Sequence, residues 1–473
     1  MKGVIIAGTG SGVGKTTLTA GILSSLSRRM KVQAFKVGPD FIDPMYHTAA
    51  TGRFSRNLDS FMMDDQVIRN VVGYNSKDAD ICVVEGVRGL YEGFSGDSDL
   101  GSTAHIAKIL GLPVVLVVDA GSLTRSAAAI VNGFKDFDPD VKVAGVILNK
   151  VSGPQHTDKL DIAMERYCPG IMVLGKIRKD PGVTLGQRHL GLHTIKSFDA
   201  ETAQGLESVG DAVDLDGLVG LAEEFSVDLP DTSPFRHEDA HAKVAVPMDS
   251  AYSFYYRDNL DCLMASGLEP IYFDAVEGEP LPDADMAYLG GGYPELHAPE
   301  ISGNRDFLEG LRCMASEGKP IYGECGGLMT MCRSLETADG SEHAMAGVLD
   351  ARTVFTNKRH GPTYAIAEAT PANPFFTGRV KGHEYHYSDT YPSSGPVYGF
   401  DVLRGAGIAD GKDGLVSGSC MGAYMHQHAL SMDDWAKGFR ESLVRCDEHV
   451  HRRKQDYALI IGVLLQVICE SRT

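Results

Sequence analysis

The chain has 473 residues, of which 43% are hydrophobic and 23% are charged, a composition typical of globular proteins with a sizeable core. Its 44 Lys and Arg against 63 Asp and Glu give a net charge of −19. This charge argues against a general nucleic-acid-binding surface, because phosphate neutralisation needs clustered basic side chains. The nine cysteines show no paired spacing, and no apolar run reaches the roughly 20 residues of a membrane helix. The first residues lead directly into a strand, which leaves no room for a signal peptide. We therefore expect a cytoplasmic protein without nucleic-acid or membrane partners.

The first half of the chain alternates short apolar runs with stretches of helical periodicity. Continuous apolar runs suit strands that are covered on both faces. Helices between such strands predict a parallel, doubly wound α/β sheet. These strands are expected at residues 3–8, 32–37, 81–86, 114–120, 144–149 and 171–177.

A polar, proline-containing segment without periodicity, residues 226–242, separates this series from a second one. We expect it to link an amino-terminal domain (1–225) to a second α/β domain (243–446). Residues 447–473 join a basic cluster to an apolar segment, and the sequence assigns them no function. The strands of the second domain are expected at 243–249, 269–274, 286–292 and 320–325.

A glycine-rich loop, GTGSGVGKTT, follows the first strand and opens a helix. This context predicts a phosphate-binding loop for ATP, because backbone N–H groups at a helix start bind phosphate oxygens. Lys15 is expected to reach the β- and γ-phosphates, and Thr16 to hold Mg²⁺. The first glycine lies one residue earlier than the common spacing, and Gly10 stands where partitioning ATPases carry a second lysine. The expected loop residues are Gly8, Gly12, Gly14, Lys15, Thr16 and Thr17.

Polar side chains follow three of the predicted strands. Asp40 lies in KVGPDFIDP, and Glu85 ends ICVVEG. Carboxylates at the carboxyl ends of strands beside a triphosphate commonly hold Mg²⁺, so we expect a metal site of Thr16, Asp40 and Glu85. Asn149 ends another strand, where it either recognises the adenine base or forms a simple turn.

The second half contains a candidate nucleophile. Cys325 lies in YGECGGLM between a predicted strand and helix, the context of a nucleophile elbow, which we expect to lower the pKa of the thiol. His426 and His428, in AYMHQHAL, would point the same way on a strand, so that one acts as base and the other orients it. Three successive glycines of LGGGYPEL can line an oxyanion site with their N–H groups, namely Gly290, Gly291 and Gly292.

Together these motifs resemble the cobyrinate a,c-diamide synthase family, in which a domain similar to dethiobiotin synthetase is joined to a class I glutamine amidotransferase domain. The resemblance covers about residues 1–445. It implies a two-domain α/β enzyme that uses ATP, Mg²⁺ and L-glutamine to amidate the a and c acetates of cobyrinate, a tetrapyrrole, through acyl phosphates. A homodimer is compatible with it. The blocks that carry it are IAGTGSGVGKTT, FKVGPDFIDPMYHTAATGRFSRNLDS, VVEGVRGLYEG, GSTAHIAKIL, AGVILNKV, LGGGYPEL, YGECGGLM and GHEYHYSD.

The resemblance also implies roles for individual residues. Cys325 matches the glutaminase nucleophile and His426 its general base, whereas His428 stands where related amidotransferases place a glutamate. Asn149 matches an adenine-side position. The residues that match ATP–Mg²⁺ positions are Lys15, Thr16, Asp40 and Glu85. Candidates for the tetrapyrrole pocket, where arginines suit carboxylates, are Asp43, Tyr46, His47, Arg53, Arg56, Arg88 and the HEYHY cluster (383–387).

Four alternatives stay open at this point. The same residues would serve a sister enzyme that amidates Ni-sirohydrochlorin on the way to coenzyme F430, although the DPMYHTAATGRFSRNLDS block favours the corrinoid branch. Cobyric acid synthase has the same domain types, but GHEYHYSD favours the a,c-diamide group. A biotin-pathway ligase fused to an inert domain, or a regulatory nucleotide switch, would not explain Cys325 together with His426.

Overall fold

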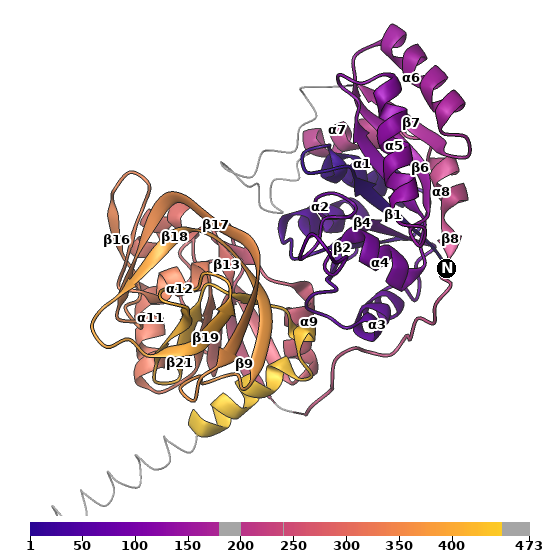
Figure 1. Cartoon of the computed structure of the whole chain (residues 1–473). Helices are drawn as coiled ribbons and strands as arrows, with labels where there is room; N and C mark the ends of the chain where they lie inside the picture. Colours follow the sequence, from indigo (N-terminus) through magenta and orange to yellow (C-terminus); the bar gives the residue numbers. More distant parts are fainter. Residues whose placement is uncertain (179–199, 240, 447–473) are drawn as a thin grey trace, which may run out of the picture. The chain divides into compact units, whose positions relative to one another are not determined.

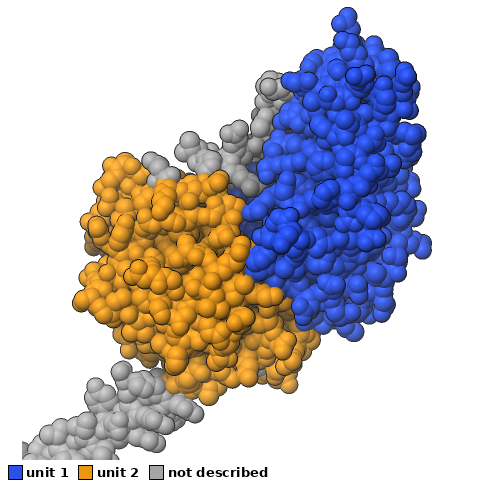
Figure 2. Space-filling model, viewed as in Figure 1, with its two compact units in different colours: residues 1–234 blue, residues 235–473 orange. Residues whose placement is uncertain are grey.

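The computed structural model describes residues 1–178, 200–239 and 241–446. The chain divides into two compact units, Met1–Pro234 and Phe235–Thr473, which Figure 2 shows in different colours. This division falls inside 226–242, the segment for which the sequence predicts a linker. Among the residues described, no helix is both long enough and apolar enough to cross a membrane.

The first unit is built on a parallel sheet with helices packed on it (Figure 1). Its strand order is β3-β2-β4-β1-β5-β6-β7, with β8 antiparallel to β1. The strands are β1 (Lys2–Gly8), β2 (Val32–Val37), β3 (Arg56–Leu58), β4 (Ile81–Glu85), β5 (Val114–Asp119), β6 (Val143–Val151), β7 (Met172–Arg178) and β8 (Glu223–Glu224). The helices are α1 (Lys15–Ser27), α2 (Ile42–Thr51), α3 (Asp65–Asn75), α4 (Thr103–Leu110), α5 (Arg125–Phe137), α6 (Pro154–Tyr167), α7 (Ala200–Asp211) and α8 (Leu215–Leu221).

Continuous apolar sequence explains this sheet. Every residue of β2 and β4 is buried, as expected for strands that are covered on both faces. The apolar side of α1 packs with β1, β4 and β5 in one core cluster. The expected parallel, doubly wound sheet is confirmed. Because β1, β2 and β4 are adjacent and parallel, the segments after their carboxyl ends are brought together.

The second unit has a larger mixed sheet of order β11-β9-β12-β14-β21-β20-β19-β17-β15-β16, with β18 pairing β17 and β22. Its first five strands are parallel to one another. Its strands are β9 (Ala242–Pro247), β11 (Leu268–Phe273), β12 (Met286–Leu289), β14 (Ile321–Glu324), β15 (Ser334–Glu336), β16 (Glu342–Ala344), β17 (Ala351–Ala369), β18 (Arg379–Pro392), β19 (Tyr398–Arg404), β20 (Lys412–Ser417), β21 (Cys420–Ala423) and β22 (His426–Gln427). A separate pair is formed by β10 (Tyr252–Phe254) and β13 (Gly291–Gly292).

Short helices and turns complete this unit. The helices are α9 (Arg257–Ala265), α10 (Ala298–Gly303), α11 (Arg305–Ser316) and α12 (Gly326–Met331), with 3₁₀ turns η2 (Pro294–Leu296) and η3 (Ala429–Ser431) and helical residues at 435–446. The four predicted strands of the parallel part are found within two residues of their expected starts. The segment 447–473, to which the sequence assigned no function, lies outside the described residues.

Candidate active site

The phosphate-binding loop lies between β1 and α1, as the sequence predicts. Gly14 precedes α1 with φ of 100°, a left-handed conformation that favours glycine, and a Cβ there would overlap Asn149 Nδ2. A Cβ at Gly8 would approach Val13 Cγ2 to 2.7 Å and Lys15 Cδ to 2.9 Å. Glycine at these two positions therefore lets the loop fold tightly against its own helix and against β6.

Lys15 is buried at the start of α1. Its Nζ donates to Gly10 O at 3.0 Å, inside the loop. Burial and the nearby Lys36 ammonium lower the Lys15 pKa from 10.5 to about 8. A bound anion such as a phosphate would stabilise the charged form of this lysine.

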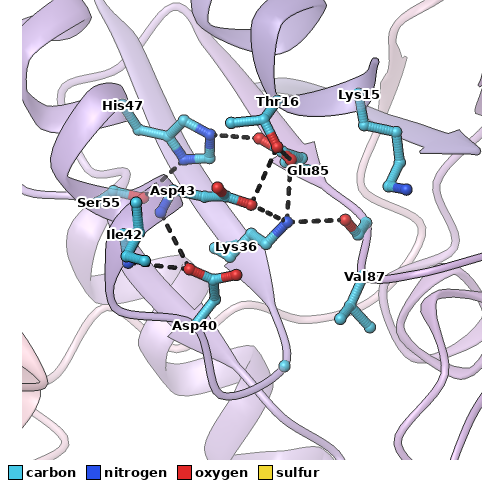
Figure 3. Close-up of polar contacts among 12 residues, drawn as sticks. Lys15, Thr16, Lys36, Asp40, Ile42, Asp43, His47, Ser55, Glu85 and Val87 are labelled. Atoms are coloured by element: carbon cyan, nitrogen blue, oxygen red, sulfur yellow. Dashed lines mark hydrogen bonds and ion pairs between the residues drawn. The ribbon is translucent and has the colours of Figure 1, made fainter. Parts of the chain in front are cut away.

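Next to the loop lies a buried cluster of charged side chains (Figure 3). Lys36 Nζ contacts Asp43 Oδ2 at 2.7 Å and Glu85 Oε1 at 2.9 Å, and donates to Gly86 O at 2.9 Å. Thr16 Oγ1 donates to the same two carboxylates, at 3.2 Å to Asp43 and 3.0 Å to Glu85. His47 Nε2 lies 2.6 Å from Glu85 Oε2. Side chains from α1, β2, α2 and β4 thus converge on one point.

The charges in this cluster depend on one another. Burial opposes the Lys36 charge, but Asp43 and Glu85 outweigh it and hold the pKa of Lys36 above its usual value. Burial likewise opposes ionisation of Glu85, but Lys36 and the hydrogen bond from His47 outweigh it and lower the Glu85 pKa. The cluster therefore has one ammonium between two ionised carboxylates.

The expected metal site needs one correction. Asp40 Oδ1 accepts from the backbone N–H groups of Ile42 and Asp43 at 2.9 and 3.0 Å, so it caps the first turn of α2. The carboxylate that the structure brings to Thr16 and Glu85 belongs to Asp43, which the sequence had assigned to the tetrapyrrole. Two carboxylates and a hydroxyl fit Mg²⁺, which is usually held by one or two carboxylates together with substrate phosphates and water. Among the residues described, no three His, Cys, Asp or Glu form a self-sufficient metal cage.

Asn149 and Lys150 hold the phosphate-binding loop from the end of β6. Asn149 Nδ2 donates to Val13 O at 2.8 Å, and Lys150 Nζ donates to Gly12 O at 2.9 Å and contacts Asp119 Oδ2 at 2.6 Å. Asn149 thus supports the loop directly. An open pocket of about 520 Å³ adjoins these strand ends, and it is lined by residues 121–124, 152–156 and 159.

The remaining tetrapyrrole candidates of this unit lie in different places. His47 is buried in the charged cluster, Tyr46 is half-buried on α2, and Arg88 is exposed on the loop after β4. The assignment of Arg53 to the tetrapyrrole pocket needs correction. Arg53 lies near the amino end of β2, away from the phosphate-binding loop. Its guanidinium contacts Asp78 at 2.8 and 3.0 Å and holds the Asp78 pKa at about 2.

The HEYHY cluster lies on β18 in the second unit, and three of its side chains are buried in that unit. His383 Nδ1 lies 3.0 Å from Tyr256 Oη, and Glu384 accepts from the N–H groups of Ala406 and Gly407. His386 stacks on the Tyr424 ring at 3.6 Å. These three side chains therefore support the second unit and are not exposed carboxylate receptors.

Cys325 lies on the predicted elbow between β14 and α12. Its φ of 47° is left-handed, which is rare for a residue with a side chain and marks a strained turn. Its N–H donates to Ala423 O at 2.7 Å. A Cβ at Gly327 would overlap Leu289 O, so glycine there allows α12 to lie directly on β12.

The expected lowering of the Cys325 pKa is wrong for this structure. Burial, followed by the neighbouring carboxylate of Glu295, raises the thiol pKa above its usual value. Burial also raises the Glu295 pKa from 4.5 to about 7. The six residues of α12 do not offset these effects. The thiol is therefore protonated at rest, and attack requires a base that takes its proton.

His426 is brought towards Cys325 by the pairing of β14 with β21, in which Glu324 lies beside Ala423. Its Nδ1 lies 3.4 Å from Glu324 Oε2, its ring stacks on His383 at 5.0 Å, and a Cβ at Gly291 would overlap its Cε1. The imidazole thus stacks on His383 and lies close to the backbone of Gly291.

The nitrogens of His428 face groups other than the His426 ring. His428 Nδ1 accepts from Leu430 N–H at 3.1 Å, its Nε2 lies 3.4 Å from Asp258 Oδ2, and its ring packs on Tyr256 at 4.6 Å. The expectation that one of the two histidines orients the other is therefore wrong.

The three glycines of the expected oxyanion site have different surroundings. The Gly290 N–H donates to Tyr255 Oη at 2.8 Å, so it is already used. Gly291 and Gly292 form β13 opposite β10, and Gly292 N lies 3.2 Å from where a Cβ at Gly326 would be. Gly291 and Gly292 therefore remain the candidates beside the nucleophile.

The sequence reasoning did not find three groups. Lys36 is the one charged residue of the mostly apolar run VQAFKV, and this charge was the available signal. Glu324 directly precedes the nucleophile at the buried end of β14. Glu295 gives no signal in the sequence beyond its place in LGGGYPEL.

Each of the two units matches a known protein family. Residues 4–192 match the CobQ/CobB/MinD/ParA nucleotide binding domain, and residues 243–434 match the CobB/CobQ-like glutamine amidotransferase domain. A cobyrinate a,c-diamide synthase of Methanococcus maripaludis is 42% identical over 445 residues, which cover 91% of this chain and 97% of that protein. One from Methanocaldococcus jannaschii is 41% identical over 439 residues, with 91% and 97% covered.

A third relative, the cobyrinate a,c-diamide synthase of Methanothermobacter thermautotrophicus, is 41% identical over 446 residues and covers 92% of this chain and 98% of its own length. The two family matches include the phosphate-binding loop and the Cys325 elbow. The chain therefore belongs to the cobyrinate a,c-diamide synthase family and is a glutamine-hydrolysing ligase with a nucleotide-binding domain and an amidotransferase domain.

Proposed function

We propose that this enzyme amidates the a and c acetate carboxylates of cobyrinate in cobalamin biosynthesis, with ATP and glutamine as co-substrates. The observation that carries the proposal is Cys325 on a left-handed turn, with its N–H bonded to the strand that leads to His426. The phosphate-binding loop on the first unit supplies the other half of the chemistry. The names of the curated relatives support cobyrinate as the substrate.

In the glutaminase half-reaction, Cys325 Sγ attacks the side-chain amide carbon of glutamine while His426 takes the thiol proton. The N–H groups of Gly291 and Gly292 would stabilise the oxyanion. His426 then returns the proton to the leaving nitrogen, which departs as ammonia. Water hydrolyses the glutamyl thioester and releases glutamate and the free thiol.

In the synthetase half-reaction, a substrate carboxylate oxygen attacks the γ-phosphorus of ATP, and ADP leaves. Lys15 balances the growing charge on the phosphate oxygens, and the loop N–H groups position them. Ammonia attacks the resulting acyl phosphate, and inorganic phosphate leaves as the amide forms. Two acetates require two such cycles.

Three residues of the charged cluster would hold Mg²⁺, namely Thr16, Asp43 and Glu85. Bound there, Mg²⁺ would neutralise phosphate charge during transfer. Lys36 fixes both carboxylates, and His47 holds the second oxygen of Glu85. Tyr46 and Arg88 lie next to this cluster in sequence and are proposed to contact the tetrapyrrole. The pocket at the ends of β5 and β6 is proposed for the adenine base.

The proposal is tested by offering cobyrinate and Ni-sirohydrochlorin side by side, with ATP, Mg²⁺ and glutamine, and following product mass. We expect cobyrinate to gain two amide groups with a clear preference in kcat/KM. Preference for the nickel compound would contradict the substrate assignment but keep both half-reactions. Amidation of neither would contradict the proposal as a whole.

A further inference from the structure

Glu324 lies beside the imidazole of His426, on the residue directly before the nucleophile. Its Oε2 is 3.4 Å from His426 Nδ1, and its side chain is 1% exposed. His428, which occupies the position expected for an orienting residue, has its nitrogens next to Leu430 N–H and Asp258. Of these two side chains, Glu324 is therefore the one that faces the base.

The carboxylate of Glu324 is held in a fixed position by a set of donors. Tyr322 Oη and the Gln427 N–H donate to Oε1 at 3.0 and 3.3 Å, and Tyr288 Oη donates to Oε2 at 3.3 Å. Asn259 Nδ2 in turn donates to Tyr288 Oη at 3.3 Å. Burial and the carboxylate itself raise the pKa of both tyrosines, so their hydroxyls stay protonated donors. An acceptor held in a fixed position at this point is what an imidazole Nδ1–H requires.

Two histidines of β18 that interact with His426 do not act as competing cations. His383 stacks on its ring, but burial lowers the His383 pKa well below its usual value, so that ring is neutral. Glu384 also acts electrostatically on His426, but it accepts from the N–H groups of Ala406 and Gly407. His386 is neutral for the same reason as His383.

We propose that Glu324 is the positioning residue of the glutaminase site, where it accepts the Nδ1–H of His426 and so makes the unprotonated Nε2 the atom that takes the Cys325 proton. The elbow would then carry both the nucleophile and the residue that orients its base. A carboxylate at Nδ1 fixes the tautomer of the imidazole and stabilises the imidazolium that forms on proton transfer. This matters here because the buried thiol is protonated at rest. The inference rests on the proposed roles of Cys325 and His426.

The test compares the glutaminase activity of the full-length enzyme with that of Glu324→Gln. We expect kcat to fall on the order of 10²–10⁴-fold with KM for glutamine changed less than about threefold, because a triad acid acts in the transition state. In protein labelled with ¹⁵N-histidine, the His426 signal, assigned by its loss in His426→Asn, should report the Nδ1–H tautomer. In Glu324→Gln it should report a mixture. A wild-type kcat, or an unchanged tautomer, would overturn the proposal.

Asp249→Asn is the matched control. Asp249 is another buried carboxylate of this unit that accepts backbone N–H groups, from Ala251, Tyr252 and Ala275, so its loss removes a charge without touching His426. It should leave the His426 tautomer unchanged. If Glu324→Gln does not fold, Tyr322→Phe replaces it. Removal of that donor to Oε1 should lower glutaminase kcat several-fold, and an unchanged kcat would then overturn the proposal.

The same measurements distinguish an error in the proposed glutaminase site from an error in the role of Glu324. If Cys325→Ala retained glutaminase activity, the proposed site itself would be wrong. If glutaminase depended on Cys325 but not on Glu324, only the positioning role would be wrong.

Discussion

Lys15 and Lys36 are two buried lysines whose environments shift their pKa values in opposite directions. Lys36 lies between Asp43 and Glu85, and these carboxylates outweigh the cost of burial and hold its pKa above the usual value. Lys15 is buried without a direct carboxylate contact, and its pKa falls to about 8. Lys36 therefore organises the site, whereas Lys15 is left to bind a ligand.

The Lys15 pKa predicts how ATP binding depends on pH. A group with a pKa near 8 is charged below that pH and neutral above it, so the attraction for the phosphates is lost as pH rises through about 8. Affinity for ATP, measured by calorimetry from pH 6.5 to 9.5, should weaken over the upper half of this range. Lys15→Met should bind weakly and show no such dependence. Equal affinity at pH 7 and pH 9.5 in the wild type would contradict this.

At this scale the sequence predicts some roles and misses others. Residues that end strands, such as Glu85, could be placed because parallel strands share one carboxyl edge. The partner that each side chain meets could not be predicted. In the structure Asp43 contacts Thr16, whereas Asp40 caps the first turn of α2. Glu324 was missed because nothing in the sequence shows that the tyrosines of two neighbouring strands hold it in place.

Strands of continuous apolar sequence could be predicted from the sequence. Strands in which polar and apolar residues alternate could not. Three of the predicted parallel strands, β2, β4 and β14, are buried along their whole length, and each leads into one of the motifs. The hairpin of β17 and β18 was missed. It alternates buried with half-buried residues and carries many polar side chains, including those of the HEYHY cluster. That pattern also explains why the cluster was assigned to substrate binding.

The packing of α12 on β12 gives a prediction for an element. In Gly327→Ala the new methyl group would overlap Leu289 O, so α12 and the Cys325 elbow must move. We expect unfolding to be easier by about 1–3 kcal/mol and glutaminase kcat to fall at least about tenfold. The matched change Gly303→Ala, at the end of α10, meets nothing within 4 Å and should leave both unchanged. Wild-type glutaminase in Gly327→Ala, measured beside thermal unfolding, would contradict the packing argument.

At the scale of the whole molecule, the chain carries two units with hydrophobic cores of their own. The phosphate-binding loop lies on the first unit, and Cys325, the proposed nucleophile, lies on the second. This division was predictable from the two strand series and the polar segment between them. Because the proposed residues of each half-reaction lie on a different unit, a substitution should abolish one half-reaction and leave the other intact.

The most direct test of this account uses Cys325→Ala in the full-length enzyme, with cobyrinate, ATP and Mg²⁺, and follows product mass. Glutamine should no longer support amidation, because the nucleophile is lost, whereas ammonium chloride should support it at a rate close to that of the wild type with ammonia. Lys15→Ala should fail with either nitrogen source. Amidation by Cys325→Ala with glutamine, or its failure with ammonia, would contradict the assignment of two separable sites.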